Sequence, residues 1–79
     1  MITKKDPDEF IEHLRKTLPC FIKRKNISNL LFGIISSKTL ANMDSSGEGP
    51  PRMKSGRDVF YHRDLFLAWL AKRIKKVEP

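Results

Sequence analysis

The chain has 79 residues, of which 32% are charged and 39% are hydrophobic, as expected for one small globular domain. Its longest apolar run, Leu65–Ala71, is far shorter than the roughly 20 residues that a membrane-spanning helix needs. A single cysteine excludes an intramolecular disulfide framework, and the spacing of the two histidines does not fit an ordinary zinc finger. The N-terminus turns acidic where a secretory signal would be apolar. We therefore expect a cytoplasmic protein without a metal or cofactor.

The net charge of +7 is unevenly distributed. Residues 1–20 hold as many acidic as basic side chains, so the excess lies in 21–79, and the segment 21–43 contains no acid. A field of this sign attracts phosphate backbones or anionic lipid surfaces. A chain of this size has few residues with which to enclose a substrate pocket, and the sequence shows no recognisable set of catalytic residues. We expect a binding protein and not an enzyme.

The first predicted element is a helix over about residues 7–18. Asp6 is placed to cap it, Pro7 suits the first helical position, and Glu9 completes a capping box. Pro19 ends the helix, because the residue before a proline avoids the helical region. One face carries the apolar side chains Phe10, Ile11, Leu14 and Leu18.

A second helical pattern follows Phe21–Ile22 and ends at Gly33, where a left-handed residue suits a helix C-terminus. Ser36 then caps a third predicted helix over about Ser37–Ser45. Two short helices joined by a glycine-containing turn form the helix-turn-helix pattern. Leu40 is expected to face inward.

The segment Ser45–Pro51 is rich in glycine, proline and serine and is expected to be a loop. A short β-hairpin follows over about residues 52–61, with its turn at Gly56 and basic side chains near its tip. The last helix begins around His62–Asp64. Trp69 is expected to pack in the core, and Cys20 is expected to be buried as a small apolar group.

These elements, in this order, resemble the MerR-like excisionase family, which includes phage excisionases and AlpA-like regulators. The resemblance covers about residues 21–74. It rests on Ile35–Leu40, the loop Gly47–Pro51, the Gly56–Arg57 wing, Tyr61, and Asp64–Leu65 followed by Trp69–Leu70. It implies a mostly α-helical fold with a small β-hairpin, a winged helix-turn-helix, over residues 21–79. Residues 1–20 would then be an added N-terminal helix that packs on this core.

The resemblance also implies a function. Such a protein binds double-stranded DNA in a sequence-specific manner, as an excisionase-like accessory factor in recombination or as a phage or prophage transcriptional regulator. The implied partners are duplex DNA in the nucleoid, a second copy of the chain on DNA, and a recombinase of the integrase type; a membrane is not among them.

Phe66 and Leu67 stand where the family usually has polar residues. The N-terminal helix is one explanation for them, since it would cover this apolar surface. A dimer interface on the same surface is the other. The alternative function is accordingly a small protein–protein interaction module that uses Phe66 and Leu67. A membrane-surface helix ending in Arg73, Lys75 and Lys76 is a third interpretation.

The residues expected to contact DNA are basic or polar side chains of four segments. In the third helix, Lys38 can reach guanine or phosphate and Asn42 can pair with adenine, while Ser36 and Ser37 favour a phosphate at the helix N-terminus. Arginine at a hairpin tip suits a narrow minor groove or a phosphate. The other residues expected to contact DNA are basic side chains that reach its phosphate backbone or belong to the wing: Lys23, Arg24, Lys25, Arg52, Lys54, Arg57 and Arg63.

Overall fold

The computed structural model describes residues 7–74, which form a mostly helical domain with a small antiparallel sheet. None of the helices within this range has the length and apolar composition to cross a membrane. The elements in chain order are α1 (Pro7–Thr17), β1 (Phe21–Lys23), the short 3-10 helix η1 (Arg24–Asn26), α2 (Ile27–Leu30), α3 (Ser37–Ser46), β2 (Met53–Ser55), β3 (Asp58–His62) and α4 (Arg63–Arg73).

Helix α1 confirms the first predicted element. Acidic side chains stand in its first turn and basic ones in its last turn, an arrangement that complements the helix dipole. The helix ends at Thr17, two residues before Pro19. The predicted capping residue Asp6 lies outside the described residues.

Helix α3 begins as the sequence predicts. The Ser36 side chain accepts a hydrogen bond from the Thr39 amide at 3.1 Å, which caps the helix N-terminus. Gly47, in the left-handed conformation, ends the helix. Leu40 is fully buried, as expected from its place on the inner face.

The sheet has the strand order β1-β3-β2, with both pairings antiparallel. Ser55 pairs with Asp58 across a two-residue turn, in which Gly56 has a φ of 61°. A left-handed residue at the first of two central turn positions is typical of a type II′ hairpin, where glycine is strongly preferred. The predicted hairpin is therefore confirmed, but a third strand accompanies it.

The segment that begins at Phe21 differs from the prediction. Phe21 and Ile22, which were expected only to lead into the second helix, form strand β1 together with Lys23, and the central residue Ile22 is buried opposite Tyr61 of β3. The helical part is confined to η1 and the single turn of α2. Burial of Ile22 against Tyr61 and the hydrogen bonds to β3 outweigh the local helical pattern, since tertiary packing routinely overrides propensity.

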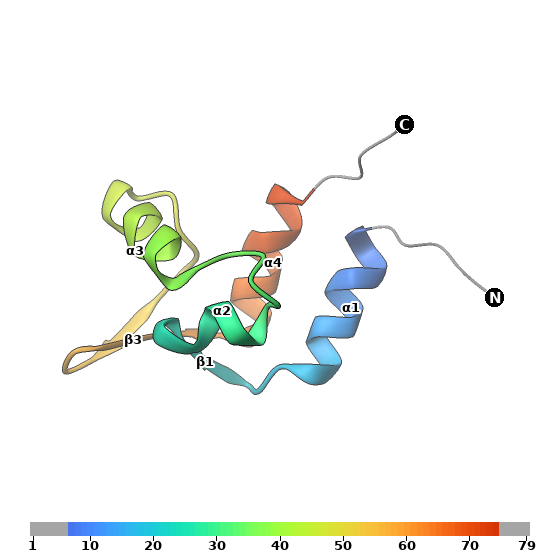
Figure 1. Ribbon diagram of the computed structural model, residues 1–79, viewed down its shortest axis with the longest axis horizontal. Coiled ribbons are helices and arrows are strands. Elements are labelled where there is room, and N and C mark those ends of the chain that lie inside the picture. Colours follow the sequence, from blue (N-terminus) through green and yellow to red (C-terminus); the bar gives the residue numbers. More distant parts are fainter. Residues whose placement is uncertain (1–6, 75–79) are drawn as a thin grey trace.

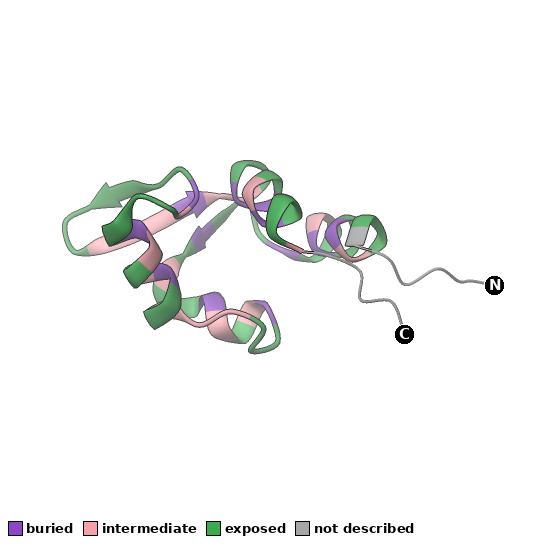
Figure 2. Cartoon of the chain, turned by 90° about the horizontal axis from the view of Figure 1, so that it is seen from above, coloured by how far each residue is buried: buried purple, intermediate pink, exposed green. Residues whose placement is uncertain are grey.

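Helices α1 and α4 lie side by side, and the sheet extends away from them and ends at the turn of the β2–β3 hairpin (Figure 1). Their facing sides are buried, whereas the hairpin tip is exposed (Figure 2). Leu14 of α1 and Phe66 and Leu67 of α4 belong to one core and are each fully buried, so the last two present no exposed surface to a partner. Cys20 is exposed, and the prediction that it is buried is wrong.

Candidate nucleic-acid interface

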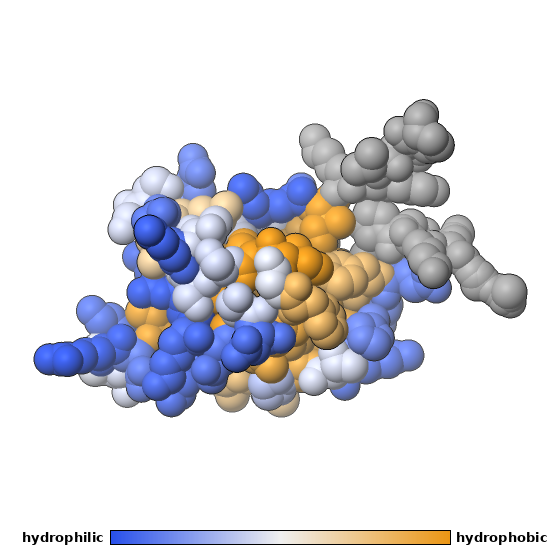
Figure 3. Space-filling view, viewed as in Figure 1, coloured by the Kyte–Doolittle hydropathy of each residue, from blue (hydrophilic) through white to orange (hydrophobic). Residues whose placement is uncertain are grey.

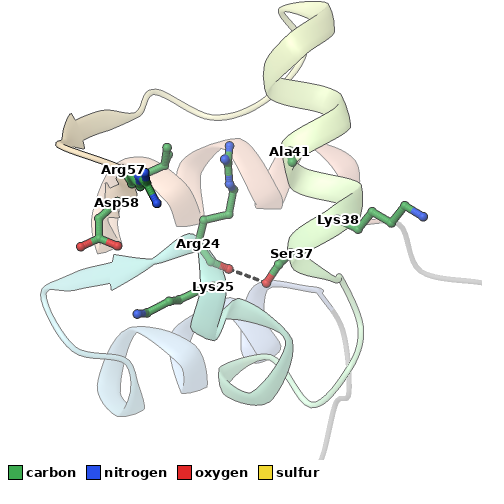
Figure 4. Close-up of a pocket in the computed structure, with 8 residues that line it drawn as sticks. Arg24, Lys25, Ser37, Lys38, Ala41, Arg57 and Asp58 are labelled. Atoms are coloured by element: carbon green, nitrogen blue, oxygen red, sulfur yellow. Dashed lines mark hydrogen bonds between the residues drawn. The ribbon is translucent and has the colours of Figure 1, made fainter.

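An open cleft lies between α3 and the end of the β2–β3 hairpin, with η1 at its base; we call it the basic cleft. It is lined by Arg24, Lys25, Ser37, Lys38, Ala41, Arg57, Asp58 and Val59. Its walls thus come from three segments that are far apart in the sequence. In Figure 4, the hairpin residues lie on one side and the α3 residues on the other.

The first turn of α3 is fixed against the base of the cleft. The Ser37 hydroxyl donates a hydrogen bond of 2.6 Å to the backbone carbonyl of Arg24, as the dashed line in Figure 4 shows. This contact positions Lys38, whose side chain is exposed and extends outward from α3, away from Arg57. The hydroxyl of Ser37 therefore has a structural partner within the protein.

Asp44 of α3 joins the elements behind the cleft. Its Oδ2 accepts a hydrogen bond of 2.7 Å from the Tyr61 hydroxyl and one of 2.8 Å from Nη1 of Arg24. Only 4% of the Asp44 side chain is exposed. Burial, together with the hydrogen bond to Asp44, raises the pKa of Tyr61 well above its ordinary value of 10. The three side chains hold α3, η1 and β3 together.

The loop after α3 is adapted to this carboxylate. A Cβ at Gly49 would collide with Oδ1 of Asp44, so a glycine is required for the loop to pass so close. The indole nitrogen of Trp69 donates a hydrogen bond of 2.9 Å to the Glu48 carbonyl, which ties the same loop to α4. Trp69 also contacts Phe66 and lies under the guanidinium of Arg73.

Among the predicted DNA contacts, the structure brings together five: Arg24, Lys25, Ser37, Lys38 and Arg57. Their availability differs. The guanidinium of Arg24 is held by Asp44, so this residue supports the cleft and contributes little free positive charge. Lys25, Lys38 and Arg57 are exposed.

Three further predicted residues lie close to the cleft without lining it. Asn42 is exposed on α3, one turn beyond Lys38. Lys54 pairs with Val59 in the sheet register and so shares the side of the sheet that faces the cleft. Ser36 caps α3.

The remaining predicted residues are not in the cleft. Lys23 lies on the opposite side of the sheet, where its Nζ is 3.8 Å from Asp58. Nη1 of Arg52 is 3.9 Å from Oδ1 of Asp44. Arg63, at the start of α4, donates hydrogen bonds to the Leu18 carbonyl and to Asp64, and its hydrogen bond to Asp64 lowers the pKa of that carboxyl.

The surface in the view of Figure 3 is hydrophilic over the hairpin end and hydrophobic over the connection between α2 and α3. That connection contains Phe32 and Ile34, whose side chains are largely exposed. The candidate interface is therefore polar and basic, and the apolar area next to α3 is separate from it. Lys75 and Lys76, which belong to the basic C-terminal segment, lie outside the described residues.

Sequence reasoning missed the role of Asp44 and the close approach of Gly49. One signal was present, because Asp44 follows the inward-facing Leu40 by four residues and so shares its helix face. An acid on a buried face requires a cation or hydroxyl partner. The identity of those partners depends on contacts across 17 and 20 residues of sequence, which no local pattern reveals.

Comparison with known proteins finds no family model that matches the chain and no curated protein that is similar to it.

Proposed function

We propose that the protein binds double-stranded DNA through the basic cleft, as a winged helix-turn-helix. In this arrangement α3 is the recognition helix and enters the major groove, while the hairpin contacts the adjacent backbone or minor groove. Lys38 and Asn42 are the side chains of α3 that reach base edges, since lysine suits guanine acceptors and asparagine pairs with adenine. Arg57 and Lys54 contact the backbone from the hairpin, and Lys25 contacts it from η1.

One observation carries the proposal: α3 and the hairpin tip line the same cleft, with Arg57 exposed at the hairpin and Lys38 exposed on α3, where its side chain extends away from Arg57. A duplex that receives α3 in its major groove passes the hairpin on the same side of the protein. The excess of positive charge favours a polyanionic partner. Within this function, the family resemblance favours an excisionase-like accessory factor in recombination or a prophage regulator.

The alternative of a protein-interaction module depended on an apolar surface at Phe66 and Leu67. Both side chains are fully buried in the core that α4 shares with α1. The feature that motivated this alternative is therefore accounted for by packing within the chain.

The experiment that tests the proposal compares three single variants in binding to a labelled random duplex at low salt. Lys38→Ala and Arg57→Ala should each weaken binding and reduce the salt dependence by about one phosphate contact. Lys16→Ala, which removes an exposed cation from α1, serves as the matched control and should leave affinity nearly unchanged. Equal effects of all three variants would reject the cleft as the interface.

Sequence specificity is tested separately, by selecting bound sites from a pool of random duplexes. A sequence-specific protein should enrich a short motif, and Asn42→Ala should relax the preference at one position of that motif. A pool without any enriched motif would restrict the function to non-specific binding.

A further inference from the structure

The reverse side of the sheet carries a second set of side chains, which we call the outer sheet face. Successive residues of a strand point to opposite faces, so the register separates two groups. Ile22, Lys54, Val59 and Tyr61 face the core and the basic cleft. The outer sheet face consists of Phe21, Lys23, Met53, Ser55, Asp58, Phe60 and His62.

An exposed aromatic ring, that of Phe21, stands on this face beside the partly buried rings of Phe60 and His62. Phe21 is 56% exposed, and its ring makes edge contacts with Phe60 and His62, with centroids 6.2 and 5.4 Å away. An open hollow beside these rings is lined by Phe21, Lys23, Ser55, Asp58 and Phe60. It therefore combines aromatic surface with a cation, a hydroxyl and a carboxylate.

We propose that the outer sheet face binds single-stranded nucleic acid. An exposed ring on an open antiparallel sheet is a stacking platform for an unpaired base, whatever its sequence. In the hollow, Asp58 accepts a hydrogen bond from a base amino or imino group, Ser55 donates or accepts one, and Lys23 binds the neighbouring phosphate. This site is additional to the duplex interface, and of its lining residues only Asp58 also lines the basic cleft.

The ion pair of Lys23 and Asp58 does not block this site. Its atoms are 3.8 Å apart and each side chain is about half exposed, at 50% and 48%. Exposed ion pairs of this kind contribute little to stability. A ligand can therefore replace Lys23 as the partner of Asp58, and Asp58 as the partner of Lys23. The edge of a base then pairs with Asp58, and the phosphate pairs with Lys23.

Charge favours a nucleic acid over a second copy of the chain as the occupant. The net charge of +7 opposes association of two copies and attracts a phosphate backbone. Against the apolar rings of a second copy, the polar groups of the hollow would lose their hydrogen bonds to water without replacement. The edge of a base offers them new hydrogen-bond partners.

The two nucleic-acid sites lie mainly on opposite sides of the same strand, because Val59 lines the basic cleft and its neighbour Phe60 lines the hollow. Asp58, near the hairpin turn, borders both sites. We therefore expect the protein to hold duplex and single strand together, with Asp58 as the residue that the two linings share. The proposal of a duplex site and the proposal of a single-strand site can be rejected independently, since each predicts the effects of different variants.

The test measures binding of a labelled oligodeoxycytidine of roughly ten nucleotides, a length within the usual site size of such surfaces. Phe21→Leu keeps an apolar side chain but removes the ring, and it should weaken single-strand binding at least about fivefold. Phe32→Leu is the matched control, because Phe32 is 67% exposed and lies outside the hollow. It should leave the affinity unchanged.

Three results would overturn the proposal: equal affinity of Phe21→Leu and the unchanged protein, displacement of the single strand by duplex, or amide shifts on the outer sheet face that follow protein concentration without oligonucleotide. The last result would identify a second copy as the occupant. Phe21→Leu should retain duplex binding, whereas Arg57→Ala should weaken duplex binding and retain the single strand. Failure of duplex binding alone therefore leaves this proposal standing.

Discussion

At the scale of single residues, Asp44 is the buried acid among the described residues, and its two side-chain hydrogen bonds determine what it contributes. The carboxylate is stabilised by the Arg24 guanidinium and by the Tyr61 hydroxyl. A buried ion pair adds little over an apolar replacement, but removal of one partner leaves the other without compensation. Asp44 is thus required once Arg24 and Tyr61 are in place.

Asp44→Asn should lower the free energy of unfolding by about 1–3 kcal/mol, because it leaves the partly buried Arg24 without its counter-charge. Chemical denaturation followed by circular dichroism measures this difference. Glu12→Gln is the control, since its ion pair with Arg15 is exposed, and it should change stability by less than about 0.5 kcal/mol. Equal effects of the two substitutions would show that the Asp44 network is not stabilising.

Tyr61 makes the stability that this network contributes depend on pH above about pH 10. Its pKa in the folded state is raised above the ordinary value of 10, so its hydrogen bond contributes fully below that pH and is lost as the pH rises toward the folded value. The stability difference between the unchanged protein and Tyr61→Phe should be constant below pH 10 and shrink above it. Tyr61 is the only tyrosine, so its ionisation can be followed by tyrosinate absorbance. Titration at the ordinary pKa in the folded protein would contradict this account.

At the scale of elements, local signals in the sequence predicted α1, α3, the hairpin and the start of α4. Ser36 and Gly47 mark the ends of α3, and Gly56 marks the hairpin turn. Strand β1 was missed because three residues are too few to show an alternating pattern. It exists through its pairing with β3, which joins Phe21 to His62 far along the chain.

The same reasoning applies to the candidate site. The outward positions of α3 followed from its cap and from the burial of Leu40. The separation of Lys23 from Arg24 and Lys25 was not predictable, because it results from the strand. Lys23 stands at the end of β1 and faces the opposite side of the sheet.

The packing of α1 on α4 gives a prediction at this scale. Leu14 is fully buried in the shared core, and Leu14→Ala should destabilise the protein by about 2–5 kcal/mol. Leu65→Ala on α4 provides the matched control, because Leu65 is 51% exposed. Thermal melts of the two variants should differ widely, and coincident melts would mean that α1 does not contribute to the core.

At the scale of the whole molecule, charge and shape act together. The excess of positive charge lies after residue 20, and the cleft collects part of it between α3 and the hairpin. Neutralisation of about four to six phosphates should give a slope of log affinity against log salt of about −4 to −5 for duplex DNA. Titrations at several salt concentrations measure the slope, and a flat response would contradict an electrostatic interface.

The basic cleft as the duplex-binding surface is tested most directly by amide chemical shifts during titration with a random duplex at low salt. We predict that the largest shifts fall on Ser37, Lys38 and Asn42 of α3 and on Gly56 and Arg57 of the hairpin turn. The amide chemical shifts of α1 should remain unchanged. Shifts confined to α1 and α4, with those of α3 and the turn unchanged, would contradict the account.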